Sequence, residues 1–162
     1  MERRLFREAR DWQALRDGFS WNIPAQMNIA GLCCDDWARA DPDRVAVIHR
    51  GGDGARQVWT YGQMKRASDG LAVALAAKGV GAGDRVAILL AQHPHALITH
   101  FAAMKLGAVS LPLFTLFGED ALRYRLADSG ARALVTDPAN LDRVLALRPD
   151  LPGLEVVIST GA

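Results

Sequence analysis

Short apolar runs recur along most of the chain, and longer segments with apolar residues every three or four positions separate them. Short runs rich in Val, Ile and Leu and bounded by turn-forming residues predict β-strands. The run that follows Asp84 shows no alternation of polar and apolar positions, as expected of a strand that is covered on both faces of a sheet. The predicted strands are 45–49, 57–59, 85–90, 108–113, 133–136 and 156–159.

The intervening segments carry helix signals. Thr60 and Gln63 have the spacing of a capping box. The apolar positions that follow recur at helical spacing and predict one buried face, which consists of Met64, Ala67, Leu71, Ala74 and Leu75. Further helices are predicted where a proline, a carboxylate pair or a glycine favours a start or a stop, over 29–40, 94–106, 119–129 and 138–148.

Strands that alternate with helices predict an α/β fold with a mainly parallel sheet and helices on both faces. The first two strands are the exception, because Gly51–Gly54 suits the turn of a β-hairpin. Residues 1–30 are rich in Arg, Trp and Phe, and Pro24 disfavours a helix at Ile23. We therefore expect a short amphipathic helix and an extended arm over 1–30, and a partial α/β subdomain over 31–162.

Composition and charge exclude several functional classes. Half of the residues are hydrophobic and 23% are charged, and the formal net charge of +1 gives no field to recruit nucleic acid. No run reaches the ~20 apolar residues that cross a bilayer, and no apolar segment follows the basic opening 1–8, so neither a membrane span nor a secretory signal is predicted. The adjacent Cys33 and Cys34 suit reduced thiols near a helix. These features predict a cytoplasmic protein.

The glycine-rich segments do not match a phosphate-binding loop. Gly51–Gly54 lies between two predicted strands, whereas a phosphate loop joins a strand to a helix. Gly79, Gly81 and Gly83 follow a helix and lack the spacing of a dinucleotide-binding loop. The sequence contains neither a P-loop string nor the Gly-x-Ser-x-Gly motif of hydrolases.

Three histidines, His93, His95 and His100, occur within eight positions. Because His93 and His95 flank Pro94 at a predicted helix start, we expect their rings to diverge, and no cysteine or carboxylate lies nearby in sequence to complete a metal site. Surface or capping histidines are the favoured interpretation, and a metal role is the alternative.

Two carboxylate pairs, Asp35–Asp36 and Glu119–Asp120, lie near predicted helix starts, where they would compensate the helix dipole. The residues by themselves therefore identify no catalytic, cofactor-binding or metal-binding position.

Three strings occur in the order in which one known family has them. Trp59–Met64, continued by Ala67 and Leu71, resembles the start of the second helix of AMP-forming adenylating enzymes. Gly83–Ile88 resembles the Gly-Asp-Arg-Val segment of that superfamily. Met104–Leu113 resembles its Lys-x-Gly-Ala-x-x-x-Pro segment. Together the strings extend the resemblance over nearly the whole chain.

The N-terminal arm narrows the resemblance to one branch. Phe19–Pro24 and Met27–Ala30 are similar to the arm of acetyl- and medium-chain acyl-CoA synthetases. Gln63 replaces a frequent Glu of the superfamily and still suits a capping box, and Met27 replaces a frequent aromatic residue of that branch. The resemblance implies an incomplete, N-terminal part of the large domain of an acyl-CoA synthetase.

For the parent enzyme, the resemblance implies a two-step reaction. A carboxylate attacks the α-phosphorus of ATP to give an acyl-adenylate and pyrophosphate, and the thiol of CoA then displaces AMP. The implied cofactors are ATP, Mg²⁺ and CoA, and the implied partners are a small carboxylic acid and the remainder of the polypeptide, with an oligomer left open. The family's phosphate loop and C-terminal domain lie beyond Ala162 in relatives, and Ser159–Gly161 is too short and too early to be that loop. We therefore assign no catalytic, cofactor or metal residue, and we expect none of these cofactors to bind this segment alone.

The motif residues of the family have structural interpretations in this chain. Thr60 suits a helix cap, Gly83–Arg85 and Gly107 suit turns, and Pro112 suits a strand end. The leading hypothesis is an inactive scaffold fragment, which should be marginally stable or self-associating because its sheet would leave an unpaired edge and apolar surface. Two alternatives remain: a stand-alone α/β binding or interaction module without catalysis, and a fragment of an aryl-CoA ligase.

Overall fold

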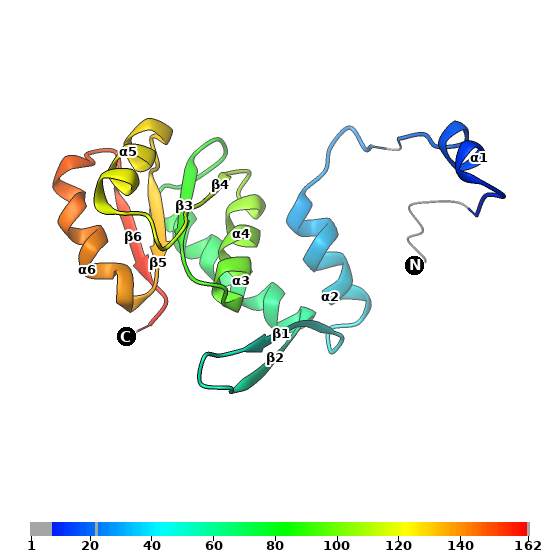
Figure 1. Ribbon diagram of the computed structural model, residues 1–162, viewed down its shortest axis with the longest axis horizontal. Helices are drawn as coiled ribbons and strands as arrows, with labels where there is room; N and C mark the ends of the chain where they lie inside the picture. The colour runs from blue at the N-terminus through cyan, green and yellow to red at the C-terminus, as the bar shows by residue number, and fades with distance from the viewer. Residues whose placement is uncertain (1–7, 22, 162) are drawn as a thin grey trace.

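The N-terminal residues form a small helix and an extended segment in the computed structural model, which describes residues 8–21 and 23–161 (Figure 1). Helix α1 (Trp12–Asp17) begins at Asp11, whose carboxylate accepts the N–H of Ala14 at 2.8 Å, and it contains no buried residue. It lies apart from the rest of the chain in Figure 1. The short helix predicted within 1–30 is therefore present, while residues 1–7 of that prediction lie outside the described residues.

Four strands of the described chain form a parallel sheet. They are β3 (Arg85–Leu89), β4 (Val109–Pro112), β5 (Ala133–Thr136) and β6 (Val156–Ser159), in the spatial order β4-β3-β5-β6. Strand β3 is internal, because Val86 is in register with Ser110 of β4 on one side and with Ala133 of β5 on the other. All four strands form where the apolar runs predicted them.

Helices cover both faces of this sheet (Figure 1). One face packs against α3 and α4, and the other packs against α5 and α6. This arrangement confirms the predicted α/β fold. The helices are α3 (Tyr61–Ala77), α4 (Pro94–Lys105), α5 (Glu119–Ser129) and α6 (Pro138–Leu147), followed by the 3-10 turn η2 (Arg148–Asp150). Within the described residues, no helix has the length and apolar character needed to cross a membrane.

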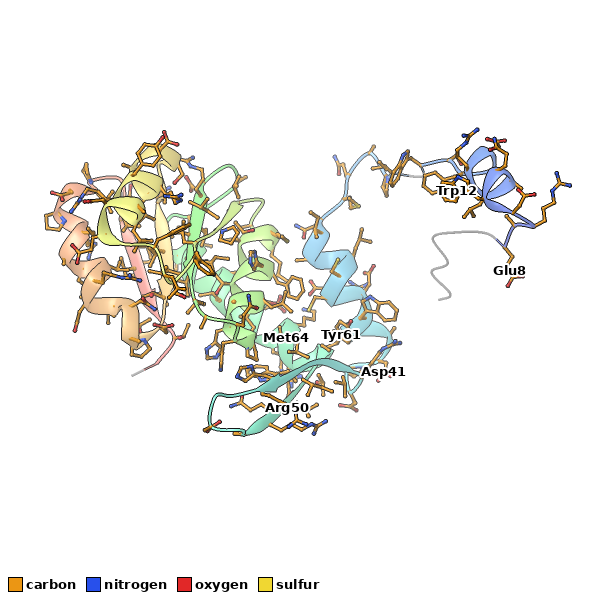
Figure 2. The ribbon with its side chains drawn as sticks, viewed as in Figure 1. Glu8, Trp12, Asp41, Arg50, Tyr61 and Met64 are labelled. Atoms are coloured by element: carbon orange, nitrogen blue, oxygen red, sulfur yellow. The ribbon has the colours of Figure 1, made fainter. Side chains whose placement is uncertain are left out.

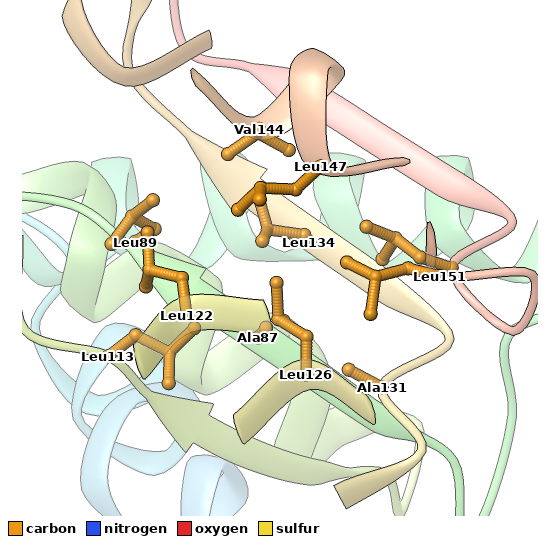
Figure 3. Packing of buried hydrophobic residues seen from close by; sticks show 11 residues of the cluster. Ala87, Leu89, Leu113, Leu122, Leu126, Ala131, Leu134, Val144, Leu147 and Leu151 are labelled. Atoms are coloured by element: carbon orange, nitrogen blue, oxygen red, sulfur yellow. The ribbon is translucent and has the colours of Figure 1, made fainter. Parts of the chain in front are cut away.

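Leucine side chains fill the space between the sheet and the α5–α6 layer (Figure 3). Leu89, Leu122, Leu134 and Leu147 are each 0–1% exposed. Burial of one such side chain is worth about 1.5–3 kcal/mol. The opposite face is packed mainly with alanine and valine. Small side chains on that face allow α3 and α4 to approach the sheet and each other closely.

The predicted hairpin lies outside the parallel sheet. Strands β1 (Val45–Arg50) and β2 (Arg56–Thr60) pair antiparallel. Gly54 in the turn has a φ of 81°, a conformation that glycine adopts without strain. The turn interpretation of this glycine-rich segment is thereby confirmed. Figure 2 shows Arg50 on the hairpin and Tyr61 at the start of α3 beside it.

Helix α3 begins with the predicted capping box. Thr60 Oγ1 accepts the N–H of Gln63 at 3.3 Å, and Gln63 Oε1 accepts the N–H of Thr60 at 2.8 Å. Two backbone N–H groups at the helix start, which have no partner within the helix, thus each donate to a side-chain oxygen.

The buried face of α3 differs from the prediction. Ala74 is exposed, whereas Gly62, Ser68 and Ala72 are buried. The hydroxyl of Ser68 donates to the carbonyl oxygen of Lys65 at 3.1 Å, so the polar side chain is satisfied within its own helix. The apolar spacing could not reveal a buried residue of this kind.

The chain is helical from residue 29 to residue 40, as predicted. The first part, η1 (Gly31–Asp35), has π-helical hydrogen bonds, and α2 (Asp36–Ala40) continues it. Ala30, Cys34 and Ala38 recur every four positions and are buried. This stripe attaches the segment to the rest of the fold.

The two adjacent cysteines are free thiols in different surroundings. Cys33 is exposed and Cys34 is buried. Burial raises the pKa of the Cys34 thiol to about 11, so the thiol is protonated at neutral pH. Cys34 therefore packs as the predicted small apolar residue.

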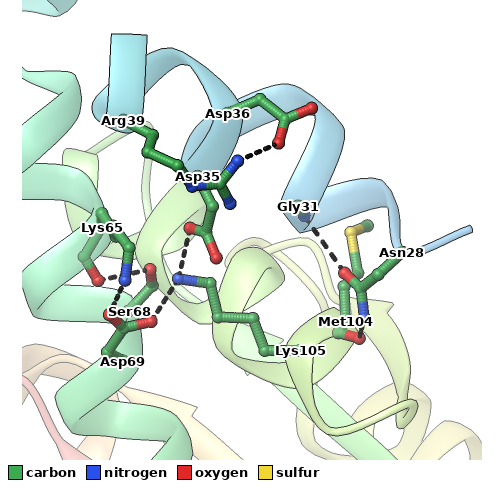
Figure 4. A network of polar contacts seen from close by, with 10 residues as sticks. All are labelled: Asn28, Gly31, Asp35, Asp36, Arg39, Lys65, Ser68, Asp69, Met104 and Lys105. Carbon is green, nitrogen blue, oxygen red and sulfur yellow. Dashed lines mark hydrogen bonds and ion pairs between the residues drawn. The ribbon is translucent and has the colours of Figure 1, made fainter. Parts of the chain in front are cut away.

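An ion-pair network joins this segment to α3 and α4 (Figure 4). The Lys105 ammonium lies 2.7 Å from an oxygen of Asp35 and also pairs with Asp69, which Lys65 contacts from within α3. Burial raises the pKa of Asp69, but the hydrogen bonds from Lys105 and Lys65 outweigh it and hold that pKa below its usual value. Only 12% of the Lys105 side chain is exposed, so this cation depends on its two carboxylates.

The predicted helix-dipole role of the Asp35–Asp36 pair is wrong for Asp35. Asp35 lies within a continuous helical segment and its carboxylate pairs with Lys105 rather than with a helix start. By contrast, Glu119 and Asp120 occupy the first turn of α5 as predicted.

We predict that Thr60→Ala lowers the free energy of unfolding by about 1 kcal/mol, because the substitution removes the capping oxygen. The measurement is urea denaturation followed by circular dichroism. Thr60→Ser retains the hydroxyl and serves as the matched control. Equal stability of the Ala and Ser variants would contradict a stabilising cap.

We predict that Lys105→Met lowers the free energy of unfolding by about 3 kcal/mol, because the mostly buried Asp35 carboxyl group would lose its ion-pair partner. Lys65→Met is the control, and it should cost less than about 1 kcal/mol because that ammonium is more exposed. Both variants can be compared in the same urea titration. Similar losses would show that Lys105 is no more important than a surface lysine.

Candidate functional site

The connections of the sheet determine where a ligand site can form. Helix α4, which follows β3, packs on one face, whereas α6, which follows the adjacent β5, packs on the opposite face. Open parallel sheets bind ligands at the carboxyl ends of their strands, near such a reversal of direction. The reversal lies between β3 and β5, so the loop after β3 is at the expected place for a site.

A groove of about 1030 Å³ lies at this edge of the sheet. The hairpin strand β1 forms one wall, the start of α4 forms another, and the loops that follow β3 and β4 form the floor and the far side. Its lining residues are Val47, Ile48, His49, Arg50, Ile88, Leu90, Ala91, Gln92, His93, Pro94, Ala96, Leu97, His100, Pro112, Leu113, Phe114, Thr115 and Phe117.

The groove combines apolar walls with basic or neutral polar groups. Apolar contact is available from residues such as Leu97 and Phe114, which are 37% and 60% exposed. The described residues that line it include no carboxylate, thiol, serine hydroxyl or lysine. This lining can hold an apolar group beside imidazole and guanidinium donors, but it does not pair a nucleophile with a base in the manner of a hydrolase.

A row of aromatic rings connects the hairpin to the start of α4. The ring centroids of His49 and His93 are 4.8 Å apart, those of His93 and His95 are 4.4 Å apart, and those of His95 and Trp59 are 6.2 Å apart. The prediction that the rings of His93 and His95 diverge is therefore wrong. Both side chains turn toward the hairpin, which the local sequence around Pro94 could not show.

His93 is the N-cap of α4, as the capping interpretation expected. Its Nδ1 atom accepts the N–H of His95 at 3.2 Å. Burial, and after it the proximity of His95 and His49, lowers the pKa of His93 below its usual value. The imidazole is consequently neutral at pH 7.

The other two helix histidines are also held neutral. Burial lowers the pKa of both His95 and His100. His100 lies two turns beyond the cap, where its Nδ1 atom is 3.0 Å from the hydroxyl of Ser110 on β4. Within the described residues, no group of three or more His, Cys, Asp and Glu side chains has an arrangement that could hold a metal ion.

Most of the family-like motif residues lie at the other end of the sheet. Gly83, Asp84 and Arg85 immediately precede or begin β3, at its amino end. The Asp84 carboxylate accepts the N–H of Gly81 at 2.8 Å, and this bond, together with Arg132, keeps the pKa of Asp84 below its usual value. These residues turn the chain and do not contact the groove.

Arg85 has a role that the motif did not reveal. Its guanidinium donates to the carbonyl oxygen of Ser129 at 2.7 Å and to that of Gly130, so it holds the last carbonyls of α5. Gly130 has a φ of 59°, and a Cβ atom there would lie 2.7 Å from the guanidinium. The positive φ favours glycine at this position, and a larger residue would also displace the Arg85 guanidinium.

The remaining candidates occupy structural positions. Gly107 has a φ of 68° in the turn before β4, and Pro112 ends β4 and lines the groove. The N–H of Thr160 donates to the carbonyl oxygen of Thr136 and thereby extends the pairing of β6 with β5. His49 and Arg50, which also line the groove, were not singled out from the sequence, because nothing in a hairpin strand distinguishes them from surface residues.

Comparison with known proteins places these features in one family. The sequence pattern of the family described as "AMP-binding enzyme" matches residues 34–162. Acetyl-coenzyme A synthetase 1 of Candida albicans is 34% identical over 118 residues, an alignment that covers 72% of this chain and 18% of that protein. The chain thus spans about a fifth of the length of the curated relatives that it matches.

Solved structures of acyl-CoA synthetases are also similar to this chain. An acyl-CoA synthetase of Brucella canis superposes with a TM-score of 0.76 at 30% identity, covering 88% of this chain and 25% of that one. The N-terminal domain of FACL13 from Mycobacterium tuberculosis superposes with a TM-score of 0.73 at 26% identity, covering 83% of this chain and 34% of that one. The resemblance inferred from the three sequence strings is confirmed. The chain belongs to the AMP-binding enzyme family and corresponds to the N-terminal part of acyl-CoA synthetases.

Proposed function

We propose that this chain is the N-terminal segment of an ATP-dependent acyl-CoA synthetase, and that it acts as scaffold in that enzyme. The observation that carries the proposal is the family match over residues 34–162 combined with a coverage of only 18% of an acetyl-CoA synthetase. The parent enzyme would join a carboxylic acid to CoA with formation of AMP and pyrophosphate. The segment itself would be inactive.

The cofactors of the family do not fit the residues of this segment. Magnesium prefers carboxylate and other oxygen ligands, and the described residues that line the groove include no carboxylate. Arg50 is the one permanent cation among them, which is a poor match for a triphosphate. We infer that ATP, Mg²⁺ and CoA are bound by other parts of the parent enzyme, and no reaction step is assigned to this chain.

This segment would contribute a rigid structural support to the enzyme. The apolar sheet and its two helix layers are rigid because they are fully packed, and they present the groove at the carboxyl ends of β3 and β4. Later parts of the polypeptide would complete that edge. A cytoplasmic location accompanies this proposal and is supported by the two free thiols.

The direct test is pyrophosphate release from ATP and CoA with short, medium-chain and aryl carboxylic acids. Both the purified 162-residue chain and the product of the complete reading frame from the same locus should be assayed. We expect release only from the complete product, with an aliphatic acid. Release from the short chain would refute the scaffold proposal, an aryl preference would favour an aryl-CoA ligase, and inactivity of both would favour a binding module.

A second prediction concerns the sheet edges. Within the described residues, β4 and β6 each pair on one side only, and Val109 on β4 is 52% exposed. Unpaired edges with apolar side chains favour association. We expect the 162-residue chain to sediment as dimers or larger species at micromolar concentration. A monomer that unfolds in one cooperative transition would count against the scaffold proposal.

A further inference from the structure

Histidine rings form one part of the contact between the hairpin and α4. Apolar hairpin residues such as Val47 also pack against the core cluster that contains Ile98 and Phe101 of α4. His49 comes from β1, and His93 and His95 come from the start of α4, with Trp59 of β2 closing the row. His93 is central, because its ring lies within 5 Å of both other imidazoles. Its protonation state therefore affects the hairpin and the helix together.

The cap on α4 requires one protonation state of His93. The Nδ1 atom accepts the backbone N–H of His95, so it carries no proton, and the neutral ring must carry its hydrogen on Nε2. A second proton could be added only at Nδ1. Protonation would therefore replace an acceptor by a donor that faces another N–H, and the helix would lose its cap.

No negatively charged group is placed to stabilise a protonated His93 among the neighbouring residues named below. The titratable groups that act on it from β1 and from α4 are His49 and His95, and each can only become positive. Arg50 follows His49 and is paired in register with Arg56 on β2, and the start of α4 adds the positive end of its dipole. Asp53 in the hairpin turn already accepts the N–H of Ala55 at 2.9 Å.

We propose that His93 is a pH-sensitive latch, which caps α4 and holds the hairpin through His49 while it is neutral, and which releases the hairpin and widens the groove when it is protonated. The β1 residues that would move form one wall of that groove. The proposal does not depend on the function suggested above, because it uses only the contacts of the hairpin with α4.

The direction of the pH effect follows from proton linkage. Burial lowers the pKa of His93 in the latched state from the ordinary value of 6.5, whereas the released imidazole would return toward 6.5. The released state therefore binds more protons between these two values. The latch is at full strength above pH 6.5 and weakens as the pH falls toward the lower pKa, by up to about tenfold per pH unit.

The test is hydrogen exchange of the 162-residue chain at pH 7.5 and pH 5.5, corrected for the intrinsic pH dependence of exchange. We expect protection of peptides from β1 and β2 to fall at pH 5.5, by up to about tenfold, and to fall more than protection of β3 and β5. A parallel fall in the hairpin and the sheet, or no fall in the hairpin, would overturn the proposal.

Substitutions at His93 distinguish the effect of losing the helix cap from the effect of protonating the imidazole. His93→Asn keeps a capping oxygen and removes the imidazole, so hairpin protection should become independent of pH. His93→Ala removes both, so protection should be reduced at both pH values without a further fall. His100→Gln, which removes an imidazole outside the ring row, is the control and should retain the wild-type response. Persistence of the fall in His93→Asn would assign it to another group and refute the latch.

A spectroscopic measurement tests the same state directly. Nitrogen-15 spectra of the histidine rings report which ring nitrogen carries the proton. At pH 7.5 we expect His93 as the Nε2–H tautomer, with titration below 6.5. Observation of the Nδ1–H tautomer, or titration above 6.5, would overturn the assignment of the cap.

Discussion

The burial of β3 on both faces is the constraint on which the rest of the structure depends. Successive residues of this strand point to opposite faces, and Val86 belongs to the core under α3 and α4 while Ala87 and Leu89 belong to the core under α5 and α6. An apolar run without alternation is therefore needed, and the connections must pass on both sides of the sheet. The same requirement places strand neighbours on both edges of β3, because its backbone groups have no access to water.

The two ends of the sheet differ in a way that follows from this packing. At the amino end of β3, side chains satisfy the backbone: Arg85 holds the end of α5, and Arg132 donates to the carbonyl oxygen of Gly79 at 2.7 Å and to Asp84 at 3.1 Å. At the carboxyl end, the hairpin strand β1, the start of α4 and the loops after β3 and β4 enclose the groove. The motif residues at the amino end thus provide rigidity, and the loops at the carboxyl end provide the surface that a ligand could meet.

The sequence predicted the fold well because its signals are local. The capping box at Thr60, the strand runs and the proline at the start of α4 depend on neighbouring residues, and all were found. The errors concern side-chain surroundings that depend on the tertiary structure. The partner of Asp35 lies seventy positions away, and His93 contacts His49 of the hairpin as well as His95. The candidate groove was not predicted from the sequence, because no local pattern indicated that β1 would form one of its walls.

Helix α4 connects these observations, since the segments that precede α3 are attached at its two ends. Its negative C-terminal end carries the Lys105 ammonium, which two carboxylates hold, and the carbonyl oxygen of Met104 accepts the side-chain N–H of Asn28 at 2.7 Å. Its positive N-terminal end meets neutral imidazoles, for which a charged form would be unfavourable. The charge of Lys105 interacts favourably with the C-terminal end of the helix dipole, and the neutral rings avoid an unfavourable interaction with its N-terminal end. The 29–40 helix is thus attached through an ion pair and a side-chain hydrogen bond, whereas the proposed attachment of the hairpin through His93 requires a neutral imidazole.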